Sequence, residues 1–375
     1  MEKLKEVQKV GQSIWLDFIQ RGLITSGRLK QLVDSGVSGL TSNPTIFHKA
    51  ITQGQDYDEA IKSILKSNPD AGIMDIYDRL TVEDIQMAAD VFRPVYNASD
   101  GMDGLVSLEP APALAYNTEA TIAEVRRLWQ LVDRPNLMIK VPATPPGIPA
   151  IEQLFAEGIN INITLMFSMA HYEAVSQAYL QGLARCPNPQ PITSVASFFV
   201  SRVDTYVDRE LEKIGTGEAL ALRGKAAVAN SKLVYRRFKE VFSGQEFARQ
   251  RERGARIQRV LWGSTSTKNP DYSDVKYVDE LMGPDTVNTL PKETIDLFLD
   301  HGKVRDTLNK GVAEAKQALN DLKKVGIDLD AITEQLQVDG VKAFRDSFDQ
   351  LLGALEEKCR QFRKKAAHNF NILED

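Results

Sequence analysis

Short apolar segments alternate with longer amphipathic segments along most of the chain. Eight of the short segments have the length of a buried strand. Several are almost continuously apolar, as parallel strands covered on both faces are. The segments are residues 13–19, 36–42, 104–109, 136–142, 158–166, 192–199 and 259–264, with a weaker one at 285–290. The pattern therefore predicts eight strands, each followed by a longer element.

Helical periodicity marks the segments between the predicted strands. After Asn117 or Thr118 as an N-cap, apolar residues recur every three or four positions. Pro149 suits the first turn of the next helix, Gly158 ends that helix, and Ser168 can cap the following one. Repeated strand–helix order predicts a parallel sheet. Eight such units favour a closed (β/α)8 (TIM) barrel over an open sheet.

Two regions exceed a simple barrel. Residues 44–103 separate the second and third predicted strands and leave room for two or three extra helices. The chain from about residue 302 to residue 375 is expected to form a helical extension, whose last segment repeats apolar residues from Val341 to Phe362. This repeat predicts a helix of about 25–30 residues, more readily packed on the outside or mouth of the barrel than engaged in a coiled coil. Without an internal repeat or a low-complexity linker, residues 1–375 are expected to form a single domain.

Composition narrows the class of protein. The chain has 375 residues, a formal net charge of −5 and 43% hydrophobic residues, which is ordinary for a globular protein. The acidic balance gives no general attraction to nucleic acid or anionic membranes, and the arginine-rich residues 249–253 are expected to be a solvated helix face. Two cysteines, Cys186 and Cys359, are too few for a disulfide framework. The chain has neither a signal-like apolar start nor a membrane-length apolar run, which predicts a cytoplasmic protein.

Polar residues stand at seven of the eight predicted strand ends. In a (β/α)8 barrel the active-site groups lie at the carboxyl ends of the strands. The residues there are Asp17, Asn43, Glu109, Lys140, Asn162, Thr164, Ser197, Arg202, Ser266 and Lys268. Each alone has a structural explanation, such as a turn at Asn43-Pro44 or a β-branched filler at Thr164. Their convergence on one rim predicts a functional site there.

Lys140 is the most informative of these residues because it interrupts an apolar strand, "NLMIKVP". Burial disfavours the ammonium form of a lysine, and a free amine can attack a carbonyl to form a Schiff base. The resulting iminium draws electrons from an adjacent carbon–carbon bond, and Glu109 and Asp17 are available to carry protons. The alternative is that the Lys140 amine reaches solvent at the strand end. The strand alone leaves both open.

Other catalytic signatures are absent from the sequence. It contains no P-loop, no G-x-G-x-x-G, no H-E-x-x-H, no C-x-x-C and no G-x-S-x-G nucleophile elbow. The four histidines have no metal-like spacing. No metal site is predicted.

Five blocks of the sequence resemble the transaldolase family, in its longer bacterial-type form. They are "GLTSNPTIF" (39–47), "VSLEPAPALAYN" (106–117), "LMIKVPATPPGIPAIEQLFAEGININITLMFS" (137–168), "VASFFVSRVD" (195–204) and "GSTSTKNP" (263–270). The resemblance implies a (β/α)8 barrel of the Schiff-base aldolase class. It also implies transfer of a dihydroxyacetone unit from sedoheptulose 7-phosphate to glyceraldehyde 3-phosphate, in the non-oxidative pentose phosphate pathway.

The resemblance also implies roles for four catalytic residues. Lys140 would be the Schiff-base lysine. Glu109 and Thr164 would hold the catalytic water and relay protons during Schiff-base formation and hydrolysis. Asp17 would take and return the proton of the substrate C4 hydroxyl as the C3–C4 bond breaks and forms.

The remaining matched residues would bind the substrate. Asn43 and Asn162 would bind the hydroxyls of the dihydroxyacetone unit with Ser197 alongside, and Arg202 would bind the sugar phosphate. Lys268 stands where many family members have arginine. A lysine can bind phosphate as a point charge but cannot form the bidentate hydrogen bonds of a guanidinium. The loop after the seventh predicted strand is longer than in the family, which leaves open whether Ser266 or Thr267 meets the phosphate.

Two alternatives to a transaldolase follow from the same residues. Related fructose-6-phosphate aldolases usually carry glutamine at the position of Glu109 and tyrosine at that of Phe199, and this chain has neither. A non-catalytic sugar-phosphate-binding barrel would be indicated by loss of Lys140 or Glu109, and both are present. The implied partners are phosphorylated sugars, without a cofactor, a nucleic acid or a membrane. The sequence leaves a monomer or a homodimer open.

Overall fold

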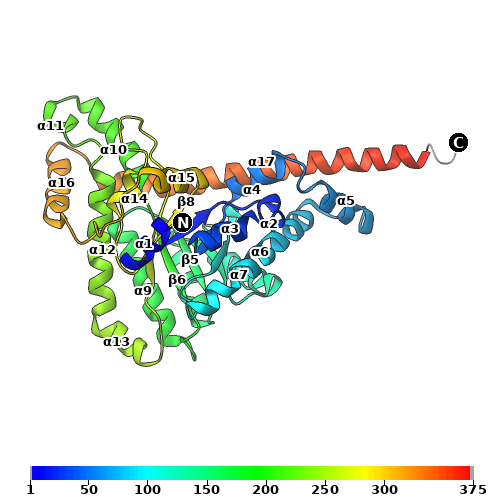
Figure 1. Ribbon diagram of the computed structural model, residues 1–375, viewed down its shortest axis with the longest axis horizontal. Coiled ribbons are helices and arrows are strands. Elements are labelled where there is room, and N and C mark those ends of the chain that lie inside the picture. Colours follow the sequence, from blue (N-terminus) through cyan, green and yellow to red (C-terminus); the bar gives the residue numbers. More distant parts are fainter. Residues whose placement is uncertain (1, 372–375) are drawn as a thin grey trace.

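The computed structural model describes the backbone of residues 2–371 and the side chains up to residue 364 (Figure 1). Eight parallel strands form one closed barrel in chain order, and β1 pairs with β8 to close it. The strands are β1 Gln12–Asp17, β2 Gly39–Thr41, β3 Leu105–Leu108, β4 Leu137–Pro142, β5 Ile161–Met166, β6 Ser194–Phe199, β7 Arg259–Gly263 and β8 Thr286–Leu290. All eight predicted strands are confirmed, including the weak one.

Helices connect the strands and cover the barrel. Those before β5 are α1 Glu2–Val10, α2 Arg21–Thr25, α3 Arg28–Ser35, α4 Pro44–Thr52, α5 Asp58–Ser67, α6 Ile73–Ala98, the short 3-10 helix η1 Pro112–Leu114, α7 Thr118–Val132 and α8 Gly147–Ala156. Those after β5 are α9 Met169–Arg185, α10 Ser201–Ile214, α11 Gly217–Leu220, α12 Ala226–Ser243, α13 Gln245–Glu252, α14 Lys276–Glu280, α15 Lys292–His301, α16 Val312–Lys324 and α17 Leu329–Asn371.

Local capping explains why several of these helices begin and end where they do. The Asn117 side chain accepts a hydrogen bond from the backbone N–H of Ala120 at the start of α7. The Ser168 side chain accepts one from the N–H of His171 at the start of α9. Gly158, with φ +83°, takes the left-handed conformation just after α8. These boundaries agree with those expected from the sequence.

The two extra regions contain the predicted helices, with one difference in length. The 44–103 segment forms α4, α5 and α6. The last helix, α17, is longer than expected, at 43 residues, and extends past the barrel (Figure 1). Its first turns bury the polar Thr333 and Gln337, at 1% and 4% exposure, so hydrophobic periodicity did not reveal them.

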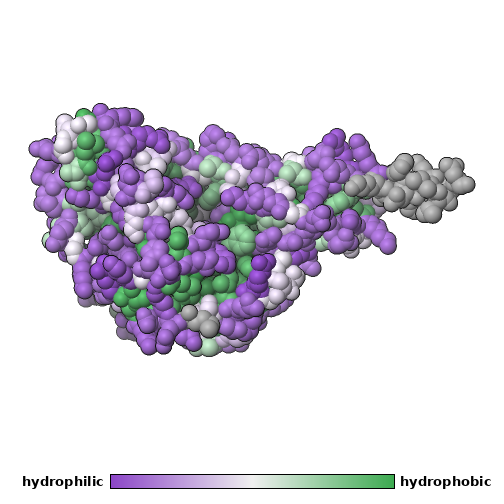
Figure 2. Space-filling view, turned by 45° about the horizontal axis from the view of Figure 1, so that its top comes forward, coloured by the Kyte–Doolittle hydropathy of each residue, from purple (hydrophilic) through white to green (hydrophobic). Residues whose placement is uncertain are grey.

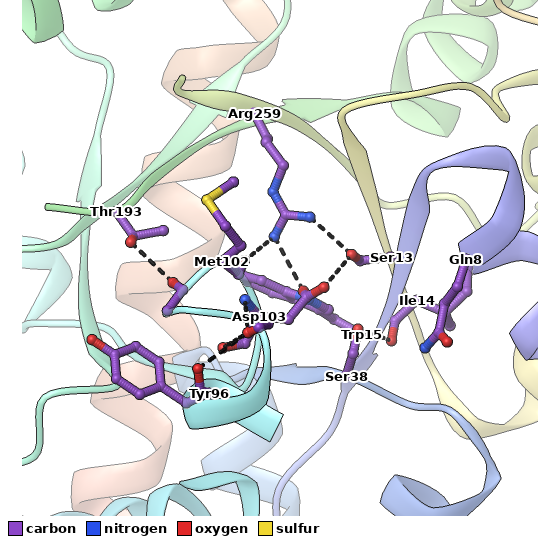
Figure 3. A network of polar contacts seen from close by, with 12 residues as sticks. Gln8, Ser13, Ile14, Trp15, Ser38, Tyr96, Met102, Asp103, Thr193 and Arg259 are labelled. Atoms are coloured by element: carbon purple, nitrogen blue, oxygen red, sulfur yellow. Dashed lines mark hydrogen bonds and ion pairs between the residues drawn. The ribbon is translucent and has the colours of Figure 1, made fainter. Parts of the chain in front are cut away.

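A polar network closes the amino-terminal end of the barrel (Figure 3). The Asp103 carboxylate, just before β3, accepts hydrogen bonds from the Ser13 hydroxyl (2.7 Å) and the Trp15 indole (2.9 Å). The Arg259 guanidinium forms an ion pair with Asp103 (3.1 Å) and donates to the Ser13 hydroxyl (2.8 Å). Trp15, Met138 and Leu261 belong to a buried apolar cluster that is separate from the main hydrophobic core. The barrel is therefore a packed core rather than a pore.

The surface is mainly polar. Hydrophilic residues cover most of the face shown in Figure 2, with smaller hydrophobic areas between them. Within residues 2–371, no helix combines the length and the apolar character needed to span a bilayer.

Candidate functional site

A cavity of about 150 Å³ opens at the carboxyl end of the barrel. Most of the residues predicted for a functional site line it: Asp17, Asn43, Lys140, Thr164, Ser197, Arg202, Ser266 and Lys268. Lys140 also lines a smaller apolar recess next to it, together with Glu109. Parallel strands in chain order bring their carboxyl ends to one mouth, so the polar strand ends meet as expected.

Lys140 lies inside this mouth rather than at its solvent edge. The residue is 5% exposed, and its Nζ donates a hydrogen bond to the Ser42 carbonyl (2.9 Å). Nζ also lies 3.2 Å from Oε2 of Glu109, whose side chain is 7% exposed. The alternative left open by the sequence, an amine that extends into solvent, is not the arrangement observed.

A bulge in β5 brings Thr164 to the cavity. Pairing between β5 and β6 shifts register between Ile163 and Met166, and Leu165 has φ +57°. A non-glycine residue held there costs about 1–3 kcal/mol, and such strain is common at functional sites. Thr164 Oγ1 is buried and has no hydrogen-bond partner among the described residues. Within the described part of the chain, this hydroxyl can still donate and accept a hydrogen bond, and it lines the cavity that Lys140 also lines.

The two carboxyl groups of the site have raised pKa values. Burial raises the pKa of Asp17, although the charge of Lys140 and a hydrogen bond from the Thr41 hydroxyl (2.7 Å) act in the opposite direction. Burial also raises the pKa of Glu109, against the opposing charge of Lys140. Carboxyl groups that accept a proton more readily than usual are suited to general acid–base catalysis.

Arg202, the second residue of α10, is the main cation of the cavity. It forms no hydrogen bond or ion pair with any described side chain, and its guanidinium carbon lies 5.5 Å from the centre of the Phe199 ring. Burial lowers the pKa of Arg202 by disfavouring its charge. Lys268 reaches the same cavity from an exposed position. Two cations without described anionic partners make this side of the cavity suitable for a phosphate group.

The structure also separates the two hydroxyl residues of the β7–α14 loop. Ser266 lines the cavity, where its hydroxyl lies 3.0 Å from that of Thr294. The Thr267 hydroxyl instead donates to the Ser273 carbonyl (2.8 Å). Of these two residues, Ser266 lines the cavity and Thr267 does not.

The two predicted asparagines differ in position. Asn43 lines the cavity and caps α4, where its side-chain oxygen accepts from the N–H of Ile46 (3.0 Å). Asn162 is fully buried and lines neither cavity. Its amide donates to the Ser107 hydroxyl (3.0 Å), and its oxygen accepts from the Ser197 hydroxyl. Asn162 therefore contacts Ser197, which lines the cavity, without lining the cavity itself.

Helix α17 contributes residues that the strand-end pattern did not include. Phe344 lines both the main cavity and the recess, and Val341 lines the recess. In the sequence these residues carry only the signal of a buried helix face, which does not identify the surface that the face covers. The C-terminal helix thus forms part of the wall around Lys140.

Fold and cavity together define a class of protein: a (β/α)8 barrel with a buried lysine and carboxyl groups at its mouth. Among the described residues, no group of three or more His, Cys, Asp or Glu is arranged to hold a metal ion.

Sequence similarity gives the particular family. A model of the transaldolase/fructose-6-phosphate aldolase family matches residues 14–355. The chain is 46% identical over 361 residues to a transaldolase of Parafrankia sp. (strain EAN1pec), covering 95% of this chain and 97% of that one. It is 46% identical over 360 residues to a transaldolase of Thiobacillus denitrificans, covering 95% and 100%. The chain belongs to the transaldolase/fructose-6-phosphate aldolase family.

Proposed function

We propose that the protein is a transaldolase, which transfers a dihydroxyacetone unit from sedoheptulose 7-phosphate to glyceraldehyde 3-phosphate in the non-oxidative pentose phosphate pathway. The products are erythrose 4-phosphate and fructose 6-phosphate, and the reaction is reversible. Relatives that carry the name transaldolase, at 46% identity over 95% of the chain, support this activity. The observation that carries the mechanism is the buried Lys140 amine, 3.2 Å from the Glu109 carboxylate. A cytoplasmic location stays a prediction.

The reaction begins at Lys140. Its neutral amine attacks the C2 carbonyl of the ketose phosphate, and the carbinolamine then loses water to give an iminium. Glu109 supplies and removes the protons of these steps. The Thr164 hydroxyl, which has no hydrogen-bond partner among the described residues, holds the water that leaves and later returns. The raised pKa of Glu109 suits it to alternate between acid and base.

Asp17 controls the carbon–carbon bond. It takes the proton from the C4 hydroxyl, the C3–C4 bond breaks, and its electron pair moves to the iminium nitrogen to leave an enamine. The aldose phosphate departs. The enamine carbon then attacks the aldehyde of the second aldose phosphate, and Asp17 returns a proton to the new hydroxyl. Hydrolysis of the resulting iminium frees Lys140.

Different residues would bind the two ends of the substrate. Arg202, Ser266 and Lys268 would take the phosphate, while Asn43 and Ser197 would hydrogen-bond the hydroxyls of the three-carbon unit. Asn162 would act through Ser197.

Transfer rather than release of the three-carbon unit requires that water be kept from the enamine. Phe344 and Phe199 supply apolar walls around the cavity, and Leu165 lines the recess. Glutamate at 109 and phenylalanine at 199 also favour transfer over the aldolase that releases free dihydroxyacetone.

Borohydride trapping tests the proposal. The protein is incubated with fructose 6-phosphate and reduced, and the adduct is located by mass spectrometry of the intact chain and its peptides. We expect a three-carbon adduct on Lys140, its absence in Lys140→Ala, and its retention in Lys268→Ala. Lys140→Ala should lower turnover at least about 10⁴-fold.

A coupled assay with fructose 6-phosphate and erythrose 4-phosphate measures the transfer itself, and activity should persist in a metal chelator. No adduct in the wild-type protein, or an adduct that survives Lys140→Ala, would overturn the mechanism. Release of dihydroxyacetone without transfer would favour the aldolase.

A further inference from the structure

One side chain of α17 connects the two strands that carry Lys140 and Thr164. Gln337 is 4% exposed, and its Nε2 donates to the Ala143 carbonyl (2.9 Å) and to the Leu165 carbonyl (3.0 Å). Ala143 directly follows β4, and its own N–H donates to the Thr164 carbonyl (2.8 Å). A single amide group therefore bridges the carboxyl ends of β4 and β5.

The bridge meets β5 at its bulge, where Leu165 has a left-handed backbone. Successive residues of a regular strand point to opposite faces of the sheet. Here the consecutive residues Thr164 and Leu165 line the main cavity and the adjoining recess, respectively. The left-handed backbone of Leu165 makes this possible and turns its carbonyl to Gln337. Because a buried carbonyl needs a donor, the bulge depends on this amide.

Three positions spaced three residues apart on α17 contact this part of the chain. Glu334 contacts Nε2 of His171 (2.8 Å), and Nδ1 of that histidine accepts from the N–H of Phe167 (3.2 Å). Gln337 contacts the bulge itself. Gly340 lets the helix approach closely, since a Cβ there would lie 2.8 Å from a methyl group of Leu165. One face of α17 is thus fitted to the end of β5.

We propose that Gln337 is a positioning residue for Thr164: its two hydrogen bonds fix the β5 bulge and thereby hold the Thr164 hydroxyl in the cavity that Lys140 lines. This inference rests on the proposed function, because it assigns Gln337 to the Schiff-base steps that Thr164 serves. Gln337 donates its hydrogen bonds to Ala143 and Leu165 and forms none with Arg202 or Lys268, the residues proposed to bind the phosphate. Its loss should therefore affect the chemistry more than substrate binding.

The first test compares two glutamines on the same helix. Gln337→Leu keeps the approximate size of the side chain and removes both hydrogen bonds. Gln335→Leu is the control, because Gln335 is exposed and its amide contacts only Asp339 of α17 among the described residues. For Gln337→Leu we expect kcat and the rate of borohydride trapping with fructose 6-phosphate to fall about 10- to 100-fold, with KM within about threefold. The control should match the wild type.

The outcomes separate the two proposals. If the wild-type protein forms no adduct, the proposed function fails. If the wild type forms it and Gln337→Leu forms it equally fast, only the positioning role fails. A large rise in KM with unchanged kcat would also overturn the positioning role.

A double-mutant cycle asks whether Gln337 acts through Thr164. Thr164→Val removes the hydroxyl and keeps the shape of the side chain. In that background Gln337→Leu should lower kcat less than about threefold, because there is no hydroxyl left to misplace. Independent effects that multiply in the double variant would overturn the proposal.

Gln337→Glu provides a test that does not depend on how well Gln337→Leu folds. A protonated glutamic acid can donate one hydrogen bond to the two carbonyls, whereas its ionised form donates none. The ratio of variant to wild-type kcat should therefore rise as the pH is lowered from 8 to 5. A ratio that stays constant across this range would contradict the proposal.

Discussion

The two ends of the barrel use buried polar residues in opposite ways. At the amino-terminal end, the Asp103 carboxylate binds Ser13, Trp15 and the Arg259 guanidinium at once (Figure 3). At the carboxyl end, neither the Arg202 guanidinium nor the Thr164 hydroxyl has a hydrogen-bond partner among the described residues. One end binds its charges to each other, and the other leaves them available to a ligand.

Size alone would have pointed to the wrong end. The hollow beside Ser13, Asp103 and Arg259 measures about 650 Å³, against about 150 Å³ for the cavity beside Lys140. What distinguishes the smaller cavity and the recess next to it is a buried amine, two carboxyl groups with raised pKa values and an arginine without a described anionic partner. Chemistry identifies the site where volume does not.

The largest expected effect is on catalysis at the carboxyl end. Glu109→Gln keeps the shape of the side chain but removes the group that moves protons during Schiff-base formation. We expect kcat in the coupled assay to fall about 10³-fold with little change in KM. A rise in KM with unchanged kcat would reassign Glu109 to substrate binding.

The matching substitution at the other end should affect stability instead. Asp103→Asn breaks the pair with Arg259 and leaves that buried guanidinium uncompensated. We expect the free energy of unfolding in urea to fall by about 3 kcal/mol, with the kcat of the folded protein unchanged. Lost activity without lost stability would mean that the two ends are not separate in function.

The phosphate side of the cavity should show a smaller effect, confined to binding. Arg202→Met removes the charge and keeps much of the stem, so KM for fructose 6-phosphate should rise about 10- to 100-fold. Lys268→Met is the paired control. Because Lys268 is exposed, its loss should raise KM less than about fivefold. Equal effects would place the phosphate between the two residues rather than on Arg202.

The smallest predicted effect is a gain in the free energy of unfolding, whereas Asp103→Asn should lower it. The folded-state pKa of Asp17 is raised, so the folded protein loses stability as the pH rises from the unfolded pKa through the folded one. Asp17→Asn removes this loss and can keep the hydrogen bond from Thr41. The variant should be about 1 kcal/mol more stable than the wild type at pH 8, with almost no difference at pH 4. Urea unfolding at both pH values measures this, and a variant less stable at pH 8 would contradict it.

Much of the fold followed from local patterns. Apolar runs predicted every strand, and the caps Asn117 and Ser168 marked the starts of α7 and α9. The start of α17 did not follow, because Thr333 and Gln337 are buried there in place of apolar side chains. Hydrophobic periodicity reports apolar burial only, so a helix face buried through hydrogen bonds is invisible to it.

The candidate site was predictable to a different degree at each residue. The lysine in an apolar strand and the polar strand ends indicated a site, and the family resemblance suggested the role of each residue. Phe344 and Gln337 were not predicted, because nothing in their local sequence says which surface they meet. Gln337 lies 172 positions from Leu165 along the chain, so only the folded arrangement joins them.

By itself, the sequence determined the order of strands and helices, and with it the meeting of Asp17, Glu109, Lys140 and Thr164 at one mouth, because parallel strands in a barrel share one carboxyl end. The tertiary structure decided how each polar group is used. It bound Asn162 to Ser197, turned Ser266 rather than Thr267 to the cavity, and brought α17 over β5. Those outcomes depend on hydrogen-bond partners and close packing between distant segments, which no local pattern encodes.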